Sequence, residues 1–344
     1  MLAQKGAGRV SPNPLVGAVI VKAGKIVGKG YHKKYGSHHA EVNALKQAGS
    51  KAKGATLFVT LEPCSHFGKT PPCVDAVIKA GIKHVVLAMK DPNPLVNGRA
   101  IRKLKKNKIA VTTGVCEAEA KLINKSFIKS ITEQKPFVIA KVGQSLDGMI
   151  TTKKGQQGWI TGEQARKYVQ KMRATIDGII IGDETVRIDD PQLNVRNSKK
   201  PQPYRVVLDP GLKIKTTNRM FTVHGGPVIL ICGLKETSKK VKEFRKKGVV
   251  VITGVPVVKK KLKLSVVLEK LYEHNLHYLM VEGGAQVFQS FMKAKLVDEW
   301  HIIVAPRIVG DQGLPWMLKG DERKLKVHTV KSLGDDELFI CTSR

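Results

Sequence analysis

Three residues in the first quarter of the chain could together hold a metal ion: His39, Cys64 and Cys73. An imidazole and two thiolates suit zinc, and three protein ligands leave a fourth tetrahedral position for water. Glu41 lies two residues after His39 and could move protons without binding the metal. Because zinc lowers the pKa of a bound water toward neutrality, this set of residues predicts hydrolytic chemistry.

The order His39-Ala40-Glu41, Pro63-Cys64 and then Cys73 follows the signature of zinc nucleobase deaminases. The spacing departs from it, because residues 65–72 separate two cysteines that the usual signature writes as C-x-x-C. Pro72 favours a helix that begins near Cys73, and a helix N-terminus favours thiolate over thiol. His39 is also expected to begin a helix, so the metal would lie between two helix starts. The structural alternative is a capping histidine with two buried cysteines.

A second set of candidates lies in the other half of the chain. Glu282-Gly283-Gly284 follows a predicted strand and precedes an apolar helix, where backbone N–H groups can hold a phosphate; a plain tight turn is the alternative. Arg173 and Arg196 could each bind a phosphate through two hydrogen bonds or form surface ion pairs. Thr161 to Gln164 is typical of a capping box. No G-x-G-x-x-G follows a strand here, so a Rossmann site is not supported.

Alternating strands and helices would position these residues in two α/β domains. The alternation of strands and helices is interrupted at about residue 134, so we place the domain boundary there, which gives domains 1–133 and 134–344. Strands are predicted at 15–21, 26–31, 56–60, 84–88 and 109–113, the first two flanking a turn at Ala23-Gly24, and helices at 39–47, 73–79, 99–106 and 117–131. The second series has strands at 137–142, 178–181, 205–208, 228–231, 249–252, 277–281, 299–304 and 337–341, and helices at 163–172, 239–247, 266–274 and 285–292.

The motifs of the first half resemble the deaminase half of bifunctional riboflavin biosynthesis deaminase/reductases. They are Ser11-Pro12-Asn13-Pro14-Leu15-Val16-Gly17, His39-Ala40-Glu41, Leu61-Glu62-Pro63-Cys64-Ser65-His66, Thr70-Pro71-Pro72-Cys73 and Asp91-Pro92-Asn93-Pro94. The order Lys141 to Gly148, Trp159 to Gly162, Arg173, Asp189 to Pro191 and Glu282 to Gly284 resembles the reductase half. The resemblance covers nearly the whole chain. It implies a cytidine-deaminase-like three-layer αβα domain followed by a dihydrofolate-reductase-like α/β domain.

The resemblance also implies two reactions. Zinc-dependent hydrolytic deamination of 2,5-diamino-6-ribosylamino-4(3H)-pyrimidinone 5′-phosphate would come first, with Glu41 catalytic and His39, Cys64 and Cys73 binding one Zn²⁺ per chain. NADPH would then reduce the ribosyl group to a ribityl chain, giving 5-amino-6-ribitylamino uracil phosphate, and Asp189 is the first candidate proton donor. Substrate contacts are implied for Asn13, His66, Lys69, Gln157, Arg173, Asp189, Leu193, Arg196 and Glu282. NADPH contacts are implied for Gly143, Trp159, Thr185, Gly284, Ala285, Gln286, Val287, Phe288, Gln289 and Ser290.

Three positions either allow a second interpretation or differ from the residue that the family commonly has. Lys69 could equally be a solvated loop lysine rather than a phosphate ligand. Gln157 stands where the family commonly has a serine, and Asn194 where it commonly has a threonine. None of these positions is a predicted metal ligand.

The composition is that of a globular protein with a strong positive charge. Lys and Arg total 60 against 28 Asp and Glu, a formal net charge of +32, which points to an acidic partner. A phosphorylated substrate would be such a partner. Two other functions are also compatible with the sequence: a nucleic-acid deaminase, and a structural zinc protein, which would need a fourth protein ligand. Five cysteines do not form a disulfide framework, and neither a signal peptide nor a membrane span is evident. We therefore expect a cytoplasmic enzyme that binds neither nucleic acid nor membrane, with a homo-oligomer as the default assembly.

Overall fold

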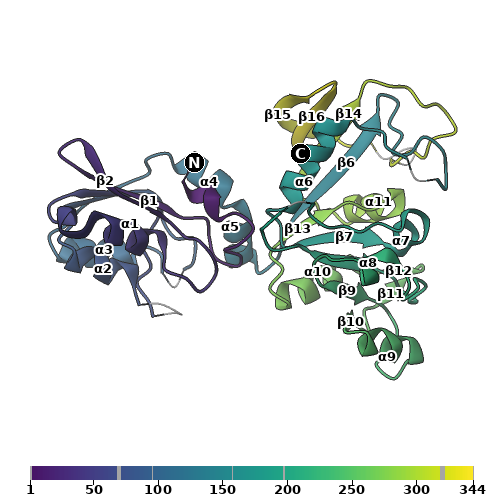
Figure 1. Cartoon of the computed structure of the whole chain (residues 1–344), viewed down its shortest axis with the longest axis horizontal. Helices are drawn as coiled ribbons and strands as arrows, with labels where there is room; N and C mark the ends of the chain where they lie inside the picture. Colours follow the sequence, from purple (N-terminus) through teal and green to yellow (C-terminus); the bar gives the residue numbers. More distant parts are fainter. Residues whose placement is uncertain are drawn as a thin grey trace. The chain divides into compact units, whose positions relative to one another are not determined.

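The computed structural model describes residues 2–67, 71–94, 96–156, 158–196, 198–317 and 322–343. The chain forms two compact units, Met1–Lys135 and Pro136–Arg344, and each has its own sheet with helices packed against it (Figure 1). Both units are α/β, as the alternating pattern predicts. No helix in the described ranges is long and apolar enough to cross a membrane.

The first unit is built on a sheet whose described strands follow the order β2-β1-β3-β4-β5. β1 runs antiparallel to β2 and β3, while β3, β4 and β5 are parallel. The strands are β1 (Gly17–Lys22), β2 (Lys25–Tyr31), β3 (Thr56–Leu61), β4 (His84–Met89) and β5 (Ala110–Thr113). The helices are α1 (Ala40–Ala48), α2 (Cys73–Lys79), α3 (Arg99–Lys106), α4 (Glu117–Ile123) and α5 (Lys125–Glu133), with 3₁₀ turns η1 (Ala3–Gly6) and η2 (Gly49–Ala52).

Helices cover both faces of this sheet. Along β4 every residue from Val85 to Met89 is buried, so both of its alternating side-chain faces are covered. α1 lies directly on β2, where Gly30 allows the close approach: a Cβ there would lie 2.2 Å from the carbonyl oxygen of Ala40. This contact fixes the start of α1, which carries two of the candidate site residues.

The second unit is built on a larger sheet with the described strand order β10-β9-β8-β7-β13-β6-β14-β16-β15. The strands from β10 to β14 are parallel, and β16 and β15 are added antiparallel at one edge. The strands are β6 (Phe137–Ser145), β7 (Gly178–Gly182), β8 (Tyr204–Leu208), β9 (Val228–Ile231), β10 (Val250–Ile252), β13 (Tyr278–Val281), β14 (Glu299–Ala305), β15 (Leu325–Leu333) and β16 (Asp336–Ser343), with a separate hairpin of β11 (Val257–Val258) and β12 (Lys261–Leu262). The helices are α6 (Glu163–Arg173), α7 (Asp183–Asp189), α8 (Arg219–Thr222), α9 (Lys239–Lys246), α10 (Leu264–Glu273) and α11 (Ala285–Lys293).

Two hydrophobic cores lie on opposite faces of this sheet. Val138, Ala140 and Val142 of β6 face one core, whereas Phe137 and Ile139 face the other. The strand order reverses between β7 and β13: after β7 the chain continues to β8, β9 and β10 on one side, whereas after β13 it continues to β14 on the other. A crevice at the carboxyl ends of the strands forms at such a switch point, and ligands bind there in open α/β sheets.

The structure corrects two expectations about the elements and adds elements that were not predicted. The single helix expected at 117–131 is two helices, α4 and α5, because the chain breaks at Asn124, whose side chain bonds both the N–H and the carbonyl of Leu15. Thr161 does not cap α6: the N-cap is Gly162, and its N–H donates to Asp336 Oδ2 at 2.7 Å. The edge strand β15 and the short helix α7 were not expected at all.

Candidate active sites

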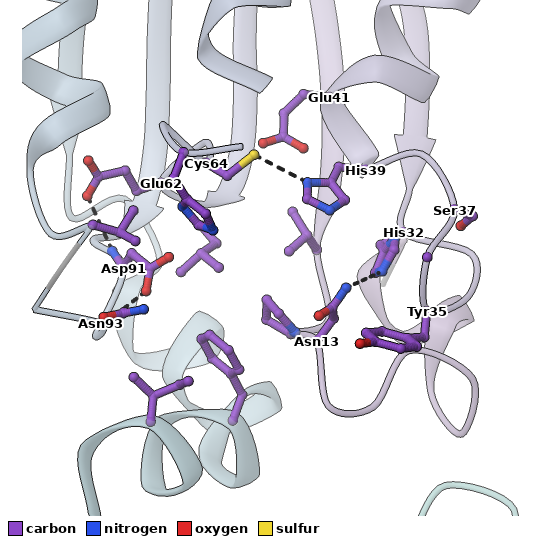
Figure 2. Close-up of a pocket in the computed structure, with 18 residues that line it drawn as sticks. Asn13, His32, Tyr35, Ser37, His39, Glu41, Glu62, Cys64, Asp91 and Asn93 are labelled. Carbon is purple, nitrogen blue, oxygen red and sulfur yellow. Dashed lines mark hydrogen bonds between the residues drawn. The ribbon is translucent and has the colours of Figure 1, made fainter. Parts of the chain in front are cut away.

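The three predicted metal ligands converge in the first unit. His39 is the N-cap residue of α1, Cys64 follows β3, and Cys73 is the first residue of α2. His39 Nδ1 lies 3.2 Å from Cys73 Sγ and 3.5 Å from Cys64 Sγ, and the Cys73 N–H donates to Cys64 Sγ at 3.2 Å. Figure 2 shows His39 and Cys64 facing each other beside Glu41. Two helix starts therefore border the site, as the sequence predicts.

The donor set fits a zinc ion. The ligand atoms of His39, Cys64 and Cys73 all lie within 4.8 Å of one another. Tetrahedral zinc at about 2.3 Å from sulfur and about 2.0 Å from nitrogen needs ligand atoms roughly 3.5–3.8 Å apart. A hydrogen bond from the Cys73 thiol, with help from His39, lowers the pKa of Cys64 to about 4, and the same bond raises the pKa of Cys73. The Cys73 proton is thus shared with the Cys64 thiolate, and a zinc ion would displace that proton and bind both sulfurs as thiolates.

Glu41 is buried beside these ligands. Its side chain is 3 % exposed, and within the described residues Oε2 has no hydrogen-bond partner. Burial raises the pKa of Glu41 to about 7, because a carboxylate loses hydration there. A buried acid with a pKa near neutrality and a spare oxygen is suited to accept and donate a proton.

These groups open onto a pocket of about 310 Å³. Asn13 and His66, two of the predicted substrate contacts, lie on its wall, while Lys69 falls outside the described residues. The described lining residues are Asn13, Pro14, Val16, His32, Tyr35, Gly36, Ser37, His39, Glu41, Leu61, Glu62, Cys64, His66, Asp91, Asn93, Val96, Phe127 and Ile131.

His32 holds Asn13 at the pocket wall. The Asn13 amide donates to His32 Nε2 at 3.0 Å, and His32 Nδ1 donates to the carbonyl of His38 at 3.2 Å. Burial lowers the pKa of His32, which favours the neutral ring that this arrangement requires. The His32 ring also stands edge-on to the ring of His39, with centroids 5.1 Å apart. One side chain therefore supports both a pocket-wall amide and a metal-ligand candidate.

Glu62 organises the opposite wall. Its buried carboxylate accepts backbone N–H groups from Asp91, Gly98, Ala100 and Ile101 at 2.9–3.3 Å. This fixes the loop that carries Asp91 and Asn93 and also satisfies the first N–H groups of α3. Asp91 Oδ1 in turn accepts the Asn93 N–H at 2.9 Å (Figure 2).

Several residues that line the pocket belong to no sequence motif, so sequence reasoning did not identify them. His32 and Tyr35 come from the segment after β2, and Phe127 and Ile131 come from α5, about 90 residues away from that segment. Glu62, Asp91 and Asn93 lie within motifs that carry the family resemblance, but no role was predicted for them.

In the second unit Glu282 forms a buried ion cluster with Arg173 and Lys141. Arg173 donates from Nε and Nη2 to the two Glu282 oxygens at 2.7 and 2.9 Å, and Lys141 Nζ lies 3.0 Å from Oε2. Burial alone would raise the pKa of Glu282, but Arg173 and Lys141 outweigh it and lower the pKa to about 2. Arg173 also donates to the carbonyl of Asn194 at 3.3 Å.

A cleft of about 600 Å³ lies at the switch point, beside the starts of α7 and α11. Of the predicted cofactor contacts, Thr185, Gly284, Gln286, Val287 and Ser290 line it. The Gly284 N–H donates to Thr185 Oγ1 at 3.1 Å, which joins the two helix starts. Three other predicted cofactor contacts are buried and do not line the cleft: Ala285, Phe288 and Gln289.

The remaining predicted contacts are spread over the second unit. Gly143 faces Thr161, since a Cβ there would lie 3.1 Å from Thr161 Cγ2. Trp159 is 61 % exposed, with the Arg166 guanidinium 5.2 Å from its ring centre. The other described residues are Asp189 at the end of α7, buried Leu193 with a positive φ of 52°, and exposed Arg196; Gln157 lies outside the described residues.

Comparison with known proteins gives the same division. Residues 136–339 match the family model described as RibD C-terminal domain, and residues 1–89 match the cytidine and deoxycytidylate deaminase zinc-binding region. The riboflavin biosynthesis protein RibD of Aquifex aeolicus is 44 % identical, over 97 % of this chain and 94 % of its own length.

Solved structures are also similar over the full chain. Acinetobacter baumannii RibD has a TM-score of 0.90 at 36 % identity, covering 100 % of this chain and 96 % of its own. A diaminohydroxyphosphoribosylaminopyrimidine deaminase/5-amino-6-(5-phosphoribosylamino)uracil reductase from Thermotoga maritima has a TM-score of 0.88 at 35 % identity with the same coverage. The chain belongs to the RibD family of riboflavin biosynthesis proteins.

Proposed function

We propose that the pocket of the first unit carries out the deamination, and the cleft of the second unit the reduction, of a bifunctional riboflavin biosynthesis enzyme. The family is a deaminase and reductase that uses Zn²⁺ and NADPH. The substrate we assign is 2,5-diamino-6-ribosylamino-4(3H)-pyrimidinone 5′-phosphate, in line with the name of the Thermotoga maritima protein. The observation that carries the proposal is the convergence of His39, Cys64 and Cys73 beside Glu41, whose Oε2 has no hydrogen-bond partner among the described residues.

In the deaminase pocket we assign His39, Cys64 and Cys73 as the zinc ligands and Glu41 as the catalytic residue. A zinc ion held by these three ligands would lower the pKa of a water and so supply a nucleophile near neutral pH. Glu41 takes a proton from the attacking water and delivers it to the exocyclic nitrogen that leaves as ammonia. Its pKa of about 7 supports both directions of transfer.

Substrate recognition in this pocket falls to the surrounding polar groups. Because the Asn13 amide donates to His32, its carbonyl oxygen is left to accept a hydrogen bond from the pyrimidine. His66 on the pocket wall and Lys69 on the same segment would bind the ribose phosphate.

In the reductase unit we assign the cofactor contacts to Gly143, Trp159, Thr185 and the segment 284–290. We assign the ribotide contacts to Gln157, Arg173, Asp189, Leu193, Arg196 and Glu282. Bound NADPH supplies a hydride to the C1 carbon of the ribose in its ring-opened imine form. Arg173 and Lys141 hold Glu282 as a carboxylate, which can accept hydrogen bonds from sugar hydroxyls. Burial raises the pKa of Asp189, the direction that a proton donor requires.

One experiment tests both halves. Zinc-loaded protein is mixed with the diaminopyrimidinone ribotide and NADPH, and ammonia release and NADPH oxidation are followed in the same tube. We expect ammonia first and loss of NADPH absorbance after it. Ammonia without NADPH oxidation would overturn the reductase assignment, and the absence of both would overturn the proposal.

We also propose that the positive charge serves these phosphorylated ligands rather than nucleic acid. An RNA deaminase would bind single-stranded RNA tightly and with a steep salt dependence. We expect an excess of mixed-sequence RNA to leave ammonia release unchanged at about 150 mM salt, near physiological ionic strength. Deamination of the RNA itself, read by sequencing, would contradict this assignment.

A further inference from the structure

Three lysines on the wall of the cofactor cleft have no role in the assignments above: Lys213, Lys260 and Lys261. Lys213 lies in the segment after β8, and Lys260 and Lys261 lie in the β11–β12 hairpin. Figure 1 places this hairpin at the same end of the sheet as α7, whose first residues line the same cleft. The three cations therefore approach the cleft from two separate segments of the chain.

The tip of the hairpin is built in an unusual way. Its two turn residues, Lys259 and Lys260, have φ values of 48° and 64°, in the left-handed region that favours glycine or asparagine. Two-residue hairpin turns of this kind are usually Asn-Gly or Gly-Gly. Lysine at both positions strains the backbone and places charged side chains at the tip of the hairpin.

The hairpin is held firmly against the sheet. Val257 packs on Gly233, where a Cβ would lie 2.4 Å from Val257 Cγ2. The chain leading into the hairpin is bonded to the segment after β9, through the Gly254 N–H to the Leu234 carbonyl at 3.0 Å and the Val255 N–H to the Cys232 carbonyl at 3.1 Å. Across the cleft, Lys261 Nζ donates to Ser290 Oγ of α11 at 3.3 Å.

The loop that carries Lys213 is held in place as well. The buried Asp209 carboxylate accepts the N–H groups of Lys213 and Ile214 at 2.6 and 3.0 Å. The backbone on both sides of the cleft is therefore fixed before any ligand arrives.

The charges of the cleft are unbalanced in favour of these lysines. Of the acidic groups on its wall, Asp183 pairs with Arg187 at 3.4 Å and Glu184 accepts from Gln286 at 3.1 Å. Across the described residues, none of the three lysines forms an ion pair with a carboxylate. Three ammonium groups without a carboxylate partner among the described residues thus line the cleft and are available to an anion.

We propose that Lys213, Lys260 and Lys261 bind the 2′-phosphate of the NADPH adenosine and make the reductase prefer NADPH to NADH. The inference rests on the assignment of this cleft to the cofactor. The diphosphate is common to both cofactors and would lie at the start of α11, so it cannot discriminate between them. The 2′-phosphate carries about two negative charges where NADH has a neutral hydroxyl, and a lysine cluster recognises that difference.

The test compares cofactor affinities in the full-length protein. The dissociation constants of NADPH and NADH are measured by quenching of tryptophan fluorescence for wild type, for Lys260→Gln/Lys261→Gln and for Lys213→Gln. Lys259→Gln is the matched control, because Lys259 belongs to the same turn but does not line the cleft. We expect the double variant to bind NADPH at least about ten-fold more weakly, with Lys213→Gln weakened in the same direction and NADH affinity changed less than about two-fold.

Competition with nucleotide fragments localises the effect. Adenosine 2′,5′-bisphosphate should displace NADPH better than AMP in wild type, and this advantage should disappear in the double variant. Equal losses for NADPH and NADH, or an equal loss in Lys259→Gln, would overturn the proposal and leave only general charge attraction. A wild type that binds NADPH without discriminating against NADH would overturn it too. If wild type bound neither cofactor, the reductase assignment itself would fail.

Discussion

Glu41 is buried, and in the part of the chain that the structure describes one of its carboxyl oxygens has no hydrogen-bond partner. Glu41→Gln keeps the shape of the side chain and removes its ability to exchange a proton. We expect ammonia release to fall by about 100-fold or more, the usual contribution of a general acid–base group. Zinc content, measured by metal analysis, should stay at the wild-type level because His39, Cys64 and Cys73 are unchanged.

The control for this variant is Glu117→Gln, which removes an exposed carboxylate on α4 that pairs with Lys121. It should leave both ammonia release and zinc content unchanged. Full deaminase activity in Glu41→Gln would contradict the proton-transfer role, and loss of zinc in that variant would show that the residue acts on the metal instead.

Glu282 makes a prediction about pH. Its pKa is lowered to about 2 in the folded chain from 4.5, so its ion cluster stabilises the fold above about pH 4.5 and this contribution is lost as the pH falls through about 2. Glu282→Gln leaves Arg173 and Lys141 buried without their carboxylate and should lower the free energy of unfolding by about 3 kcal/mol at pH 7. The difference in unfolding free energy between wild type and Glu282→Gln, measured by urea unfolding with tryptophan fluorescence, should shrink as the pH falls from about 5 toward 2.

The comparison variant is Glu163→Gln, which removes an exposed i,i+4 pair with Lys167 and should have no measurable effect at either pH. A gap between wild type and Glu282→Gln that stays constant with pH would mean that the variant acts through packing rather than charge.

The candidate site was predictable from the sequence where its residues lie in short motifs. His39, Glu41, Cys64 and Cys73 carry a recognisable order of residue types, and the structure brings them together. His32 could not be predicted, because its role depends on a contact with Asn13 that joins two separate segments. Nothing in the local sequence distinguishes it from an ordinary surface histidine.

At the scale of elements, one side chain holds a whole loop against the deaminase pocket. The Glu62 carboxylate accepts four backbone N–H groups of the segment from Asp91 to Ile101. In Glu62→Gln the amide NH₂ would face N–H donors, so two of the four would lose their acceptor. We expect the melting temperature of the first unit to fall, at a cost of about 2 kcal/mol or more.

The same change should affect substrate binding more than the chemical step, because the loop carries Asp91 and Asn93 but no metal-ligand candidate. A rise in KM for the ribotide with a smaller change in kcat would agree with this role. Glu117→Gln again serves as the matched surface variant. A loss of kcat alone, with KM and melting temperature unchanged, would contradict it.

Helices and strands with buried side chains were predicted more accurately than exposed ones. Helix α2 and strand β9 agree residue for residue with the expected ranges 73–79 and 228–231. Strand β15 was missed because it is an exposed edge strand with lysines and no buried alternation. The break at Asn124 and the N-cap at Gly162 depend on Leu15 and Asp336, which lie more than 100 residues away, so no local pattern could indicate them.

At the scale of the whole molecule, the two units differ in a way that makes them separately observable. All three tryptophans, Trp159, Trp300 and Trp316, lie in the second unit, whereas the candidate zinc ligands lie in the first. Tryptophan fluorescence therefore reports on the reductase unit alone, while far-ultraviolet circular dichroism reports on both.

Removing zinc with a chelator tests whether the metal stabilises only the unit that binds it. A ligand that binds the folded state and not the unfolded chain stabilises the fold, so the first unit should lose stability when the ion is removed, and ammonia release should stop. We expect the dichroism transition to begin at least about 5 °C lower, while the fluorescence transition moves by less than about 1 °C. NADPH binding should be unchanged in the same sample, and added zinc should restore the first transition. If the fluorescence transition fell together with the dichroism transition, the two units would be unfolding as one cooperative body, and the metal would stabilise the whole chain.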